Sequence, residues 1–268
     1  MTRRRLPRFR QVKDALPLKL MERDRKILHC LGQFSILDSG QLCRIAEGSP
    51  QGTRRRLQRL FHQGYVLRHR QPDGYNHPMA YSIARKGARA SGGTYVPNVH
   101  GRSYSHLRHQ SLVSEIRILL VEHAKGRGQV LFGQEAFPVS VKPVKAFHAT
   151  VHSQGRSLRI PIIPDLIAKL NFAGTMLTLL IEADRGTMPV RRGSLRQSSI
   201  LRKVIAYQRL AQSGQLRRLF RSRHILVVFV SESAEREANI RALVGSRFKG
   251  FRECAVTSLE HFPELIES

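Results

Sequence analysis

Apolar positions recur at helical spacing in the first quarter of the chain, and they predict three short helices. The first is expected over residues 22–34, and the second begins after Asp38, a suitable N-cap residue. The third is expected over residues 50–62, because Ser49 is a good N-cap and Pro50 favours the first turn of a helix. All three helices would bury one apolar face.

Two β-type segments follow the third helix, at residues 65–68 and 79–83, with the turn-forming sequence Gln-Pro-Asp-Gly at 71–74 between them. Three helices followed by a hairpin are typical of a winged helix-turn-helix domain, in which the hairpin is the wing. The chain is therefore divided into a flexible basic arm (1–19), a winged helix-turn-helix domain (20–90), a linker rich in Gly, Ser, Pro and Tyr (91–105) and a second domain (106–268).

In the second domain, strand-like and helix-like segments alternate after a predicted hairpin, which indicates a mixed α/β fold. The hairpin is expected from a strand at 164–170, a tight turn at 171–174 and a strand at 175–184. The other expected elements are a helix at about 105–124, strand and loop material at 125–157, a basic helix at 194–212, a strand at 224–231, a helix at 232–246 and a last strand at 253–259.

The balance of charged residues narrows the classes of protein to which the chain could belong. The 268 residues include 46 Lys and Arg against 19 Asp and Glu, a formal net charge of +27. Residues 1–105 carry an excess of 15 positive charges and residues 106–268 an excess of 12, so both domains are suited to contact a polyanion. Nucleic acid is the commonest polyanionic partner, and double-stranded DNA is the form expected for a winged helix.

The alternative polyanion is an anionic membrane. The chain has no apolar run long enough for a transmembrane helix, and no apolar signal core follows its basic start. We therefore expect a cytoplasmic, nucleoid-associated protein that does not bind membranes. Cys30, Cys43 and Cys254 are far apart and form no CxxC pair, which favours reduced free thiols.

The third predicted helix carries the candidate DNA contacts of the first domain. At 100° per residue, Arg55, Arg59 and His62 point away from its apolar stripe, and Arg54 and Arg56 lie on the flanks. Such a face can donate to guanine or hold phosphates. In the second domain, a basic segment offers further phosphate contacts, namely Arg191, Arg192 and Arg196. The alternative is that these arginines form only solvated faces.

Carboxylates stand out in so basic a chain. Asp165 begins the first strand of the hairpin, and Glu182 and Asp184 share one face at the end of the second strand. The run from Met176 to Ile181 is almost entirely apolar, which predicts a strand buried on both faces. Buried carboxylates are costly unless they are paired or bind a cation, so this group could hold Mg²⁺ or Mn²⁺.

The sequence Pro164-Asp165, a short turn and then Glu182-Ala183-Asp184 resembles the PD-(D/E)XK nuclease superfamily. The resemblance implies a restriction-endonuclease-like domain in which Asp165 and Glu182 are metal ligands, with Glu115 as a third. It departs from the superfamily at Asp184, where a catalytic lysine is usual. Three residues could supply the missing cation, namely Lys203, Lys169 and Arg185.

The longer string from Glu182 to Thr187, followed by Lys203 and Tyr207, together with the predicted winged helix, resembles the replication-relaxation family of plasmids and mobile elements. That resemblance implies a role in replication, transfer or transposition, with DNA and protein partners. Winged-helix proteins often act as dimers on two-fold sites, so a homodimer is one option.

Two hypotheses follow. The first is a DNA-binding protein of a mobile element that cleaves or nicks DNA with Mg²⁺ or Mn²⁺, in which Asp165, Glu182, Asp184 and Lys203 form the catalytic group. The second is a non-catalytic DNA-binding accessory or regulatory protein in replication, transfer or transcription, with a degenerate nuclease fold. An RNA-directed role stays open, because charge alone does not separate RNA from DNA.

Overall fold

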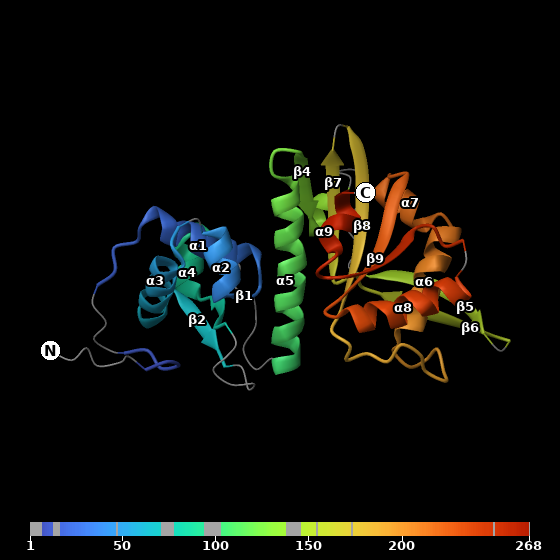
Figure 1. Cartoon of the computed structure of the whole chain (residues 1–268), viewed down its shortest axis with the longest axis horizontal. Helices are drawn as coiled ribbons and strands as arrows, with labels where there is room; N and C mark the ends of the chain where they lie inside the picture. The colour runs from blue at the N-terminus through green and yellow to red at the C-terminus, as the bar shows by residue number, and fades with distance from the viewer. Residues whose placement is uncertain are drawn as a thin grey trace. The chain divides into compact units, whose positions relative to one another are not determined.

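The computed structural model describes residues 7–12, 17–46, 48–70, 78–93, 103–137, 146–153, 155–172, 174–248 and 250–267. They form two compact units, Met1–Glu115 and Ile116–Ser268, each described by itself below (Figure 1). The division falls within a single long helix, α5. In the described part of the chain, no helix combines the length and the apolar character needed to cross a membrane.

The first unit is built from short helices around a small sheet. Its elements are α1 (Glu22–Gln33), β1 (Leu37–Asp38), α2 (Ser39–Ile45), α3 (Pro50–His62), β2 (Val66–His69), β3 (Ala80–Ile83), α4 (Arg85–Ala90) and the first part of α5 (Tyr104–Ala124). The sheet has the order β1-β3-β2, and both pairings are antiparallel. The three predicted helices and the paired hairpin strands are confirmed.

The helices of this unit begin where the sequence signals place them. The Asp38 carboxylate accepts hydrogen bonds from the backbone N–H groups of Gly40 and Gln41 at the start of α2. The Ser49 hydroxyl accepts one from Gly52 N at 3.1 Å at the start of α3. These bonds satisfy N–H groups that have no partner within the helix. The predicted wing turn (71–74) and most of the predicted linker lie outside the described residues, as does part of the basic arm.

The second unit is a mixed α/β layer structure, which confirms the predicted fold class. Its elements are the rest of α5, β4 (Gly128–Phe132), a 3-10 turn η1 (Gly133–Ala136), β5 (Phe147–Ser153), β6 (Arg156–Ile162), β7 (Leu166–Phe172), β8 (Thr175–Asp184), α6 (Ile200–Gln212), α7 (Gln215–Phe220), β9 (His224–Ser231), α8 (Ala234–Arg247), β10 (Cys254–Ser258) and α9 (Phe262–Glu267).

A five-stranded sheet with the order β10-β9-β8-β7-β4 organises this unit. β4, β7 and β8 are antiparallel neighbours, whereas β8, β9 and β10 run parallel. The predicted β7–β8 hairpin is confirmed, and Gly174 in its turn has a positive φ of 84°, a conformation that glycine adopts without strain. A separate two-stranded ribbon is formed by β5 and β6. β5 lies within residues 125–157, where the sequence predicts strand and loop material, and most of β6 lies beyond that stretch.

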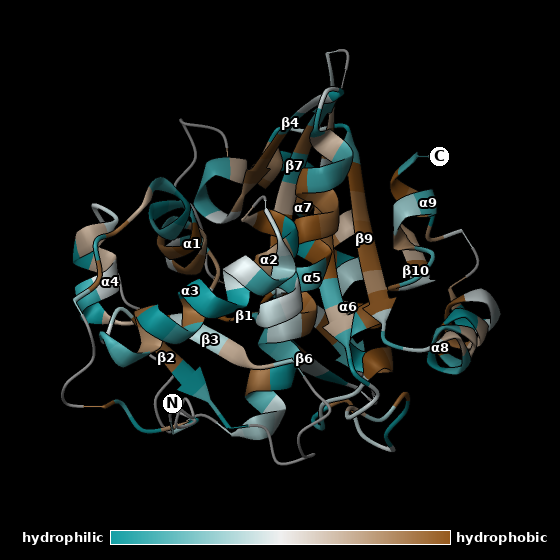
Figure 2. Cartoon of the chain, turned by 60° about the vertical axis from the view of Figure 1, so that its left-hand side comes forward, coloured by the Kyte–Doolittle hydropathy of each residue, from teal (hydrophilic) through white to brown (hydrophobic). Residues whose placement is uncertain are grey.

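One apolar core joins the sheet to the helices. It includes Leu180 of β8, Phe229 of β9, Tyr207 of α6 and Ile240 of α8. In Figure 2 the ribbon of β9 is brown over most of its length, which marks a strand of mainly hydrophobic residues. Because side chains alternate along a strand, the face of β8 that carries Leu180 also carries Glu182 and Asp184. The fold therefore points both carboxylates toward the layer that contains α6 and α8.

The predicted basic helix 194–212 needs a correction. The helix α6 begins at Ile200, because the Ser199 hydroxyl accepts the Arg202 N–H at 3.2 Å as an N-cap. Backbone bonds also tie the first turn of α6 to the preceding segment, from Ile200 N to Pro189 O at 3.1 Å and from Leu201 N to Val190 O at 2.9 Å. Residues 185–199 consequently form a loop rather than helix.

Candidate functional site

The end of β8 carries two buried carboxylates. Glu182 is 1% exposed and Asp184 is 5% exposed. A charged group at such depth is costly unless other groups compensate for its lost hydration. The structure supplies that compensation from donors on α6 and α8.

Asp165 reaches this strand end from the neighbouring strand. Leu166 is the antiparallel partner of Ile181, so continuing the register by one residue sets Asp165 opposite Glu182. The Asp165 carboxylate accepts the backbone N–H of Ala183 at 2.9 Å. Directly opposed residues of an antiparallel pair share a face of the sheet. The structure thus brings Asp165 and Glu182 together, as the sequence predicted.

Lys203 and Tyr207 of α6 hold the Glu182 carboxylate. The Lys203 ammonium donates to Oε2, and the Tyr207 hydroxyl donates to Oε1 at 2.6 Å. Residues four apart on a helix share a face, which allows both side chains to reach one carboxylate. The Lys203 side chain is 25% exposed, so the cation lies at the rim of the site while its partner is buried.

Asp184 has a different partner, Arg236 in the first turn of α8. The Arg236 guanidinium pairs with both carboxylate oxygens, and it also donates to the backbone carbonyl of Met188. The Asp184 carboxylate further accepts the Gly186 N–H at 3.3 Å. Asp184 therefore anchors the chain that leaves β8, and Arg236 ties this chain to α8. Sequence reasoning missed Arg236, because no spacing rule connects residues so far apart.

The surroundings shift the proton affinity of the cluster. Burial raises the pKa of Glu182 to about 7, and the nearby Asp165 carboxylate adds to this effect, while Lys203 opposes it. Burial alone would lower the pKa of Lys203, but the carboxylates of Glu182 and Asp165 outweigh that effect and raise it. Burial and Glu182 raise the pKa of Tyr207 well above its ordinary value. Lys203 and Tyr207 therefore stay protonated as donors at neutral pH.

The three candidate cations have different positions. Lys203 contacts Glu182 directly, as described. Lys169 is paired in register with Thr178 on the same face of the hairpin, four residues or about 13 Å along β8 from Glu182. Arg185 makes an ion pair with Glu232 at 3.6 Å. Of these three residues, Lys203 is the one that the structure brings to Glu182.

The structure gives Glu115, the third metal ligand implied by the nuclease resemblance, partners within the first unit. Its carboxylate pairs with Arg44, and it accepts a hydrogen bond from Gln41 Nε2 at 2.9 Å. Both partners lie on α2, so the carboxylate connects α5 to α2. These partners engage both oxygens of Glu115, and its implied role as a third metal ligand stays a prediction.

Two carboxylates from adjacent strand ends suit a hard divalent cation. Mg²⁺ is commonly held by one or two carboxylates, and waters and substrate phosphate oxygens complete its shell. Asp165 and Glu182 meet this requirement, although Glu182 would have to share its oxygens with Lys203 and Tyr207. Among the described residues, no group of three or more His, Cys, Asp or Glu side chains is arranged to hold a metal ion.

The basic face of α3 is smaller than predicted. Arg54, Arg55 and Arg59 are exposed, as a DNA-contacting face requires. Arg56 instead makes an ion pair with Asp24, whose side chain is fully buried. His62 is 6% exposed, and burial and the neighbouring Arg68 lower its pKa. Arg56 and His62 therefore have internal positions, which removes them from the candidate DNA contacts.

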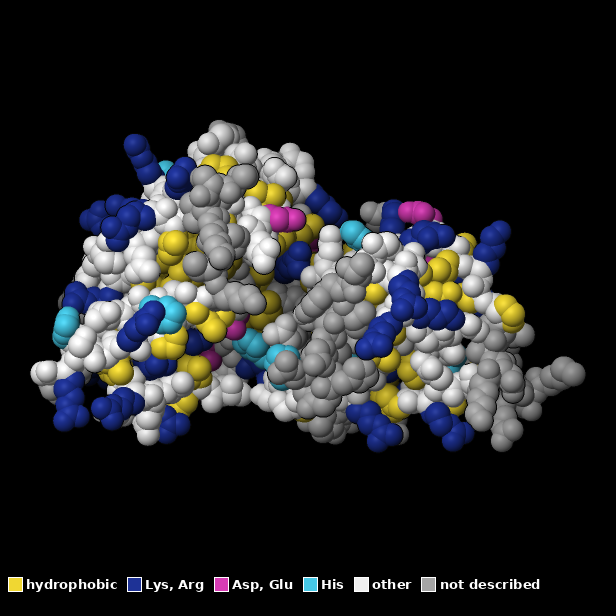
Figure 3. Space-filling model, turned by 180° about the vertical axis from the view of Figure 1, so that it is seen from behind, with side chains coloured by type: hydrophobic (Ala, Val, Ile, Leu, Met, Phe, Trp, Pro, Cys, Tyr) yellow, Lys and Arg dark blue, Asp and Glu magenta, His cyan; other side chains and the backbone are white. Residues whose placement is uncertain are grey.

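The second set of basic residues lies on the loop between β8 and α6. Arg191, Arg192 and Arg196 are exposed there, on the segment that follows the acidic cluster. In Figure 3, the viewed faces of both units show many Lys and Arg side chains and few Asp or Glu. The basic surplus is therefore spread over both units.

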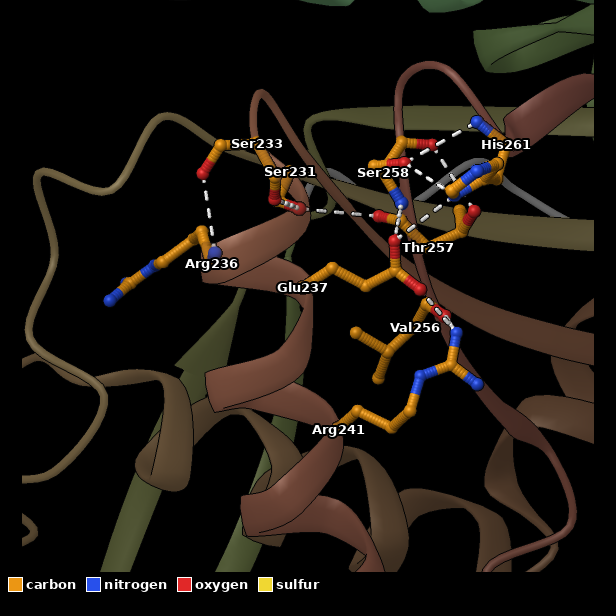
Figure 4. A network of polar contacts seen from close by, with 9 residues as sticks. All are labelled: Ser231, Ser233, Arg236, Glu237, Arg241, Val256, Thr257, Ser258 and His261. Atoms are coloured by element: carbon orange, nitrogen blue, oxygen red, sulfur yellow. Dashed lines mark hydrogen bonds and ion pairs between the residues drawn. The ribbon is translucent and has the colours of Figure 1, made fainter.

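A second polar network joins α8 to the edge strand β10 (Figure 4). Glu237 accepts the Ser258 N–H at 2.8 Å and pairs with Arg241, which also donates to the Val256 carbonyl at 2.9 Å. The Ser258 hydroxyl and the Glu237 carboxylate both approach Nδ1 of His261, at 3.0 Å and 3.6 Å. A catalytic triad needs opposite ring nitrogens for its nucleophile and its acid. The network therefore caps the backbone of an edge strand and is not a hydrolytic triad.

Comparison with known proteins supplies one match. Comparisons with curated proteins and with solved structures find nothing similar. The family model described as replication-relaxation matches residues 28–220, which is well over half of the chain and includes α3 as well as the Asp165, Glu182 and Lys203 cluster. The chain belongs to the replication-relaxation family.

Proposed function

We propose that this protein binds double-stranded DNA of a replicating or mobile element and cleaves or nicks it at the acidic site of the second unit. Membership of the replication-relaxation family supports a role in replication. The net charge of +27 supports a polyanionic partner. In the first unit, α1-β1-α2-α3-β2-β3 follow one another in the order expected of a winged helix-turn-helix. We assign it that fold, with α3 as the recognition helix.

The observation that carries the catalytic part is the contact between Lys203 and Glu182 beside Asp165. The PD-(D/E)XK pattern requires two acids and a cation, and Asp184 stands where that cation is usual. Lys203 supplies a positive charge at the same carboxylate from α6. The combination of acids and cation is thus restored by a residue 21 positions away in sequence.

Each residue then has a distinct role. Asp165 and Glu182 would hold Mg²⁺ or Mn²⁺, and such an ion supplies charge stabilisation at the phosphate and a more acidic water. Lys203 orients the attacking water and stabilises the charge that develops on the phosphate oxygens. Attack on phosphorus forms one P–O bond and breaks the bond to the leaving sugar oxygen. Asp184 acts as a positioning residue through Arg236.

The test is cleavage of supercoiled and linear DNA by the full chain with Mg²⁺, with Mn²⁺ or with excess chelator. We expect metal-dependent nicking or linearisation that is lost in Asp165→Asn and in Glu182→Gln. A matched control is Glu253→Gln, because Glu253 makes an ion pair with Arg217 at the surface of the same unit. The absence of cleavage across these substrates, with DNA binding retained, would refute the catalytic part.

A second candidate function is a non-catalytic DNA-binding accessory protein. The observation that favours it is that Lys203 and Tyr207 contact both oxygens of Glu182, while Arg236 holds Asp184. Such internal pairing is what a structural carboxylate cluster requires. The same assay separates the two functions, because the accessory protein would bind DNA with equal affinity in the Glu182→Gln variant and would cleave none.

A further inference from the structure

A surface hollow lies beside the acidic site, on the loop that leads from β8 to α6. Its volume is about 500 Å³, and it is lined by Thr187, Met188, Pro189, Arg192, Gln197 and Ser198. Thr187 follows Asp184 by three residues, a separation of at most about 11 Å of chain. The hollow therefore belongs to the immediate surroundings of the proposed cleavage site.

The walls of the hollow are fixed by hydrogen bonds. Arg236 holds the Met188 carbonyl and the Asp184 carboxylate at the same time. The Pro189 carbonyl accepts the Ile200 N–H at 3.1 Å, and Gln197 N donates to Ser194 O at 3.1 Å. A hollow held in this way loses little conformational freedom when a ligand binds.

The lining has the chemistry of a nucleotide site. Arg192 offers a cation for a phosphate, and Gln197 offers an amide that can both donate to and accept from the edge of a base. Met188 and Pro189 provide apolar surface for the face of a base, and the hydroxyls of Thr187 and Ser198 can bond to sugar or phosphate oxygens. A hollow lined only for phosphate would not need the apolar wall.

We propose that this hollow binds one unpaired nucleotide of the DNA next to the cleaved phosphate. A base inside a duplex is stacked and cannot enter a surface hollow, so the nucleotide must be single-stranded, bulged or flipped out. The proposal rests on the proposed function and deepens it, because it names the DNA structure that the site selects. Paired DNA can supply such a nucleotide by flipping one out, whereas DNA that already has an unpaired nucleotide at the cleavage point supplies it without that cost.

The test measures binding in a Glu182→Gln background, in which cleavage does not interfere. The probes are a short duplex with one bulged 2-aminopurine nucleotide and the same duplex fully paired. We expect the chain to bind the bulged probe more tightly and to change its fluorescence. The double variant Arg192→Ala, Gln197→Ala should lose about tenfold in affinity for the bulged probe and keep its affinity for the paired duplex. The matched control is Gln212→Ala, Arg252→Ala, which removes the same two residue types from exposed positions of the same unit outside the hollow.

The outcomes separate the two proposals. The nucleotide site would be overturned if the Arg192→Ala, Gln197→Ala variant lost the same affinity for both probes. It would also be overturned if the control variant lost as much affinity for the bulged probe. Either result would show a general effect on DNA binding. Preference for the bulged probe, together with a wild-type chain that cleaves neither paired nor bulged DNA, would support the hollow and refute the nuclease. A wild-type chain that binds neither probe would overturn both.

Discussion

The hydroxyl of Tyr207 donates a hydrogen bond to Glu182 at 2.6 Å, one helical turn after Lys203 contacts the same carboxylate. Both oxygens of a side chain that is 2% exposed are thereby engaged by one neighbouring helix. This arrangement compensates for part of the lost hydration and leaves a carboxyl group whose pKa is raised to about 7. Glu182 is therefore a group that changes its protonation near neutral pH.

Glu182 should make the stability of the protein depend on pH. Its pKa rises from 4.5 to about 7 on folding, so the folded state retains a proton that the unfolded state has already lost. The contribution of Glu182 to stability is fully present below pH 4.5 and is lost as the pH rises through 7. We expect the unfolding free energy of the wild type, relative to Glu182→Gln, to fall by roughly 3 kcal/mol across this window.

Urea denaturation of both proteins at several pH values between 4.5 and 8 measures this difference. The histidines titrate in the same window, but they are present in both proteins and cancel in the comparison. Parallel stability curves for the two proteins would mean that Glu182 keeps an ordinary pKa.

Lys203 should be needed for cleavage and not for DNA binding. Lys203→Gln removes the cation at Glu182, so we expect cleavage with Mg²⁺ to fall by about a hundredfold or more. The matched control is Lys169→Gln, on the same face of the hairpin but about 13 Å along the strand. Cleavage rates and DNA affinities of both variants provide the measurement. Equal cleavage losses in the two variants would assign the effect to general charge.

The helices of the first unit could be predicted closely from sequence because their signals are local. Ser49 and Pro50 set the start of α3, and its observed bounds, Pro50–His62, coincide with the prediction. The β7–β8 hairpin could be predicted equally well from the sequence, since apolar runs and a glycine turn are properties of neighbouring residues. Local rules also predicted that Glu182 and Asp184 share a face.

The partners of those carboxylates were harder to predict from the sequence. The family resemblance suggests Lys203 as one of three candidate cations, and the sequence does not choose among them. The structure shows that Lys203 contacts Glu182. Arg236 lies 52 residues from Asp184, a pairing that only the parallel arrangement of β8 and β9 brings about. The sequence predicts a helix from residue 194, whereas α6 begins at Ile200. The backbone N–H groups of Ile200 and Leu201 bond to the preceding loop, which is incompatible with a longer helix.

The ion pair between Asp24 and Arg56 should stabilise the first unit. Asp24 is fully buried, and besides Arg56 it accepts the Met21 N–H at 2.8 Å at the start of α1. Asp24→Asn keeps the shape but leaves Arg56 without its counter-charge, which should cost about 3 kcal/mol. The control is Glu22→Gln, an exposed acid in the same helical turn, which should change stability by less than about 0.5 kcal/mol. Chemical denaturation should separate the two variants, and similar values for both would show that the ion pair adds no net stability.

The exposed arginines of α3 should determine how DNA binding responds to salt. Each phosphate contact contributes about 0.9 to the slope of log affinity against log salt concentration. We expect Arg54, Arg55 and Arg59 changed together to Gln to lower that slope by about 2 to 3. The control changes Arg25, Arg85 and Arg89 to Gln, which removes the same charge from exposed positions of this unit outside α3. Because both triple variants lose the same net charge, a difference in slope reports direct phosphate contact. Equal slopes would mean that α3 does not lie against the DNA.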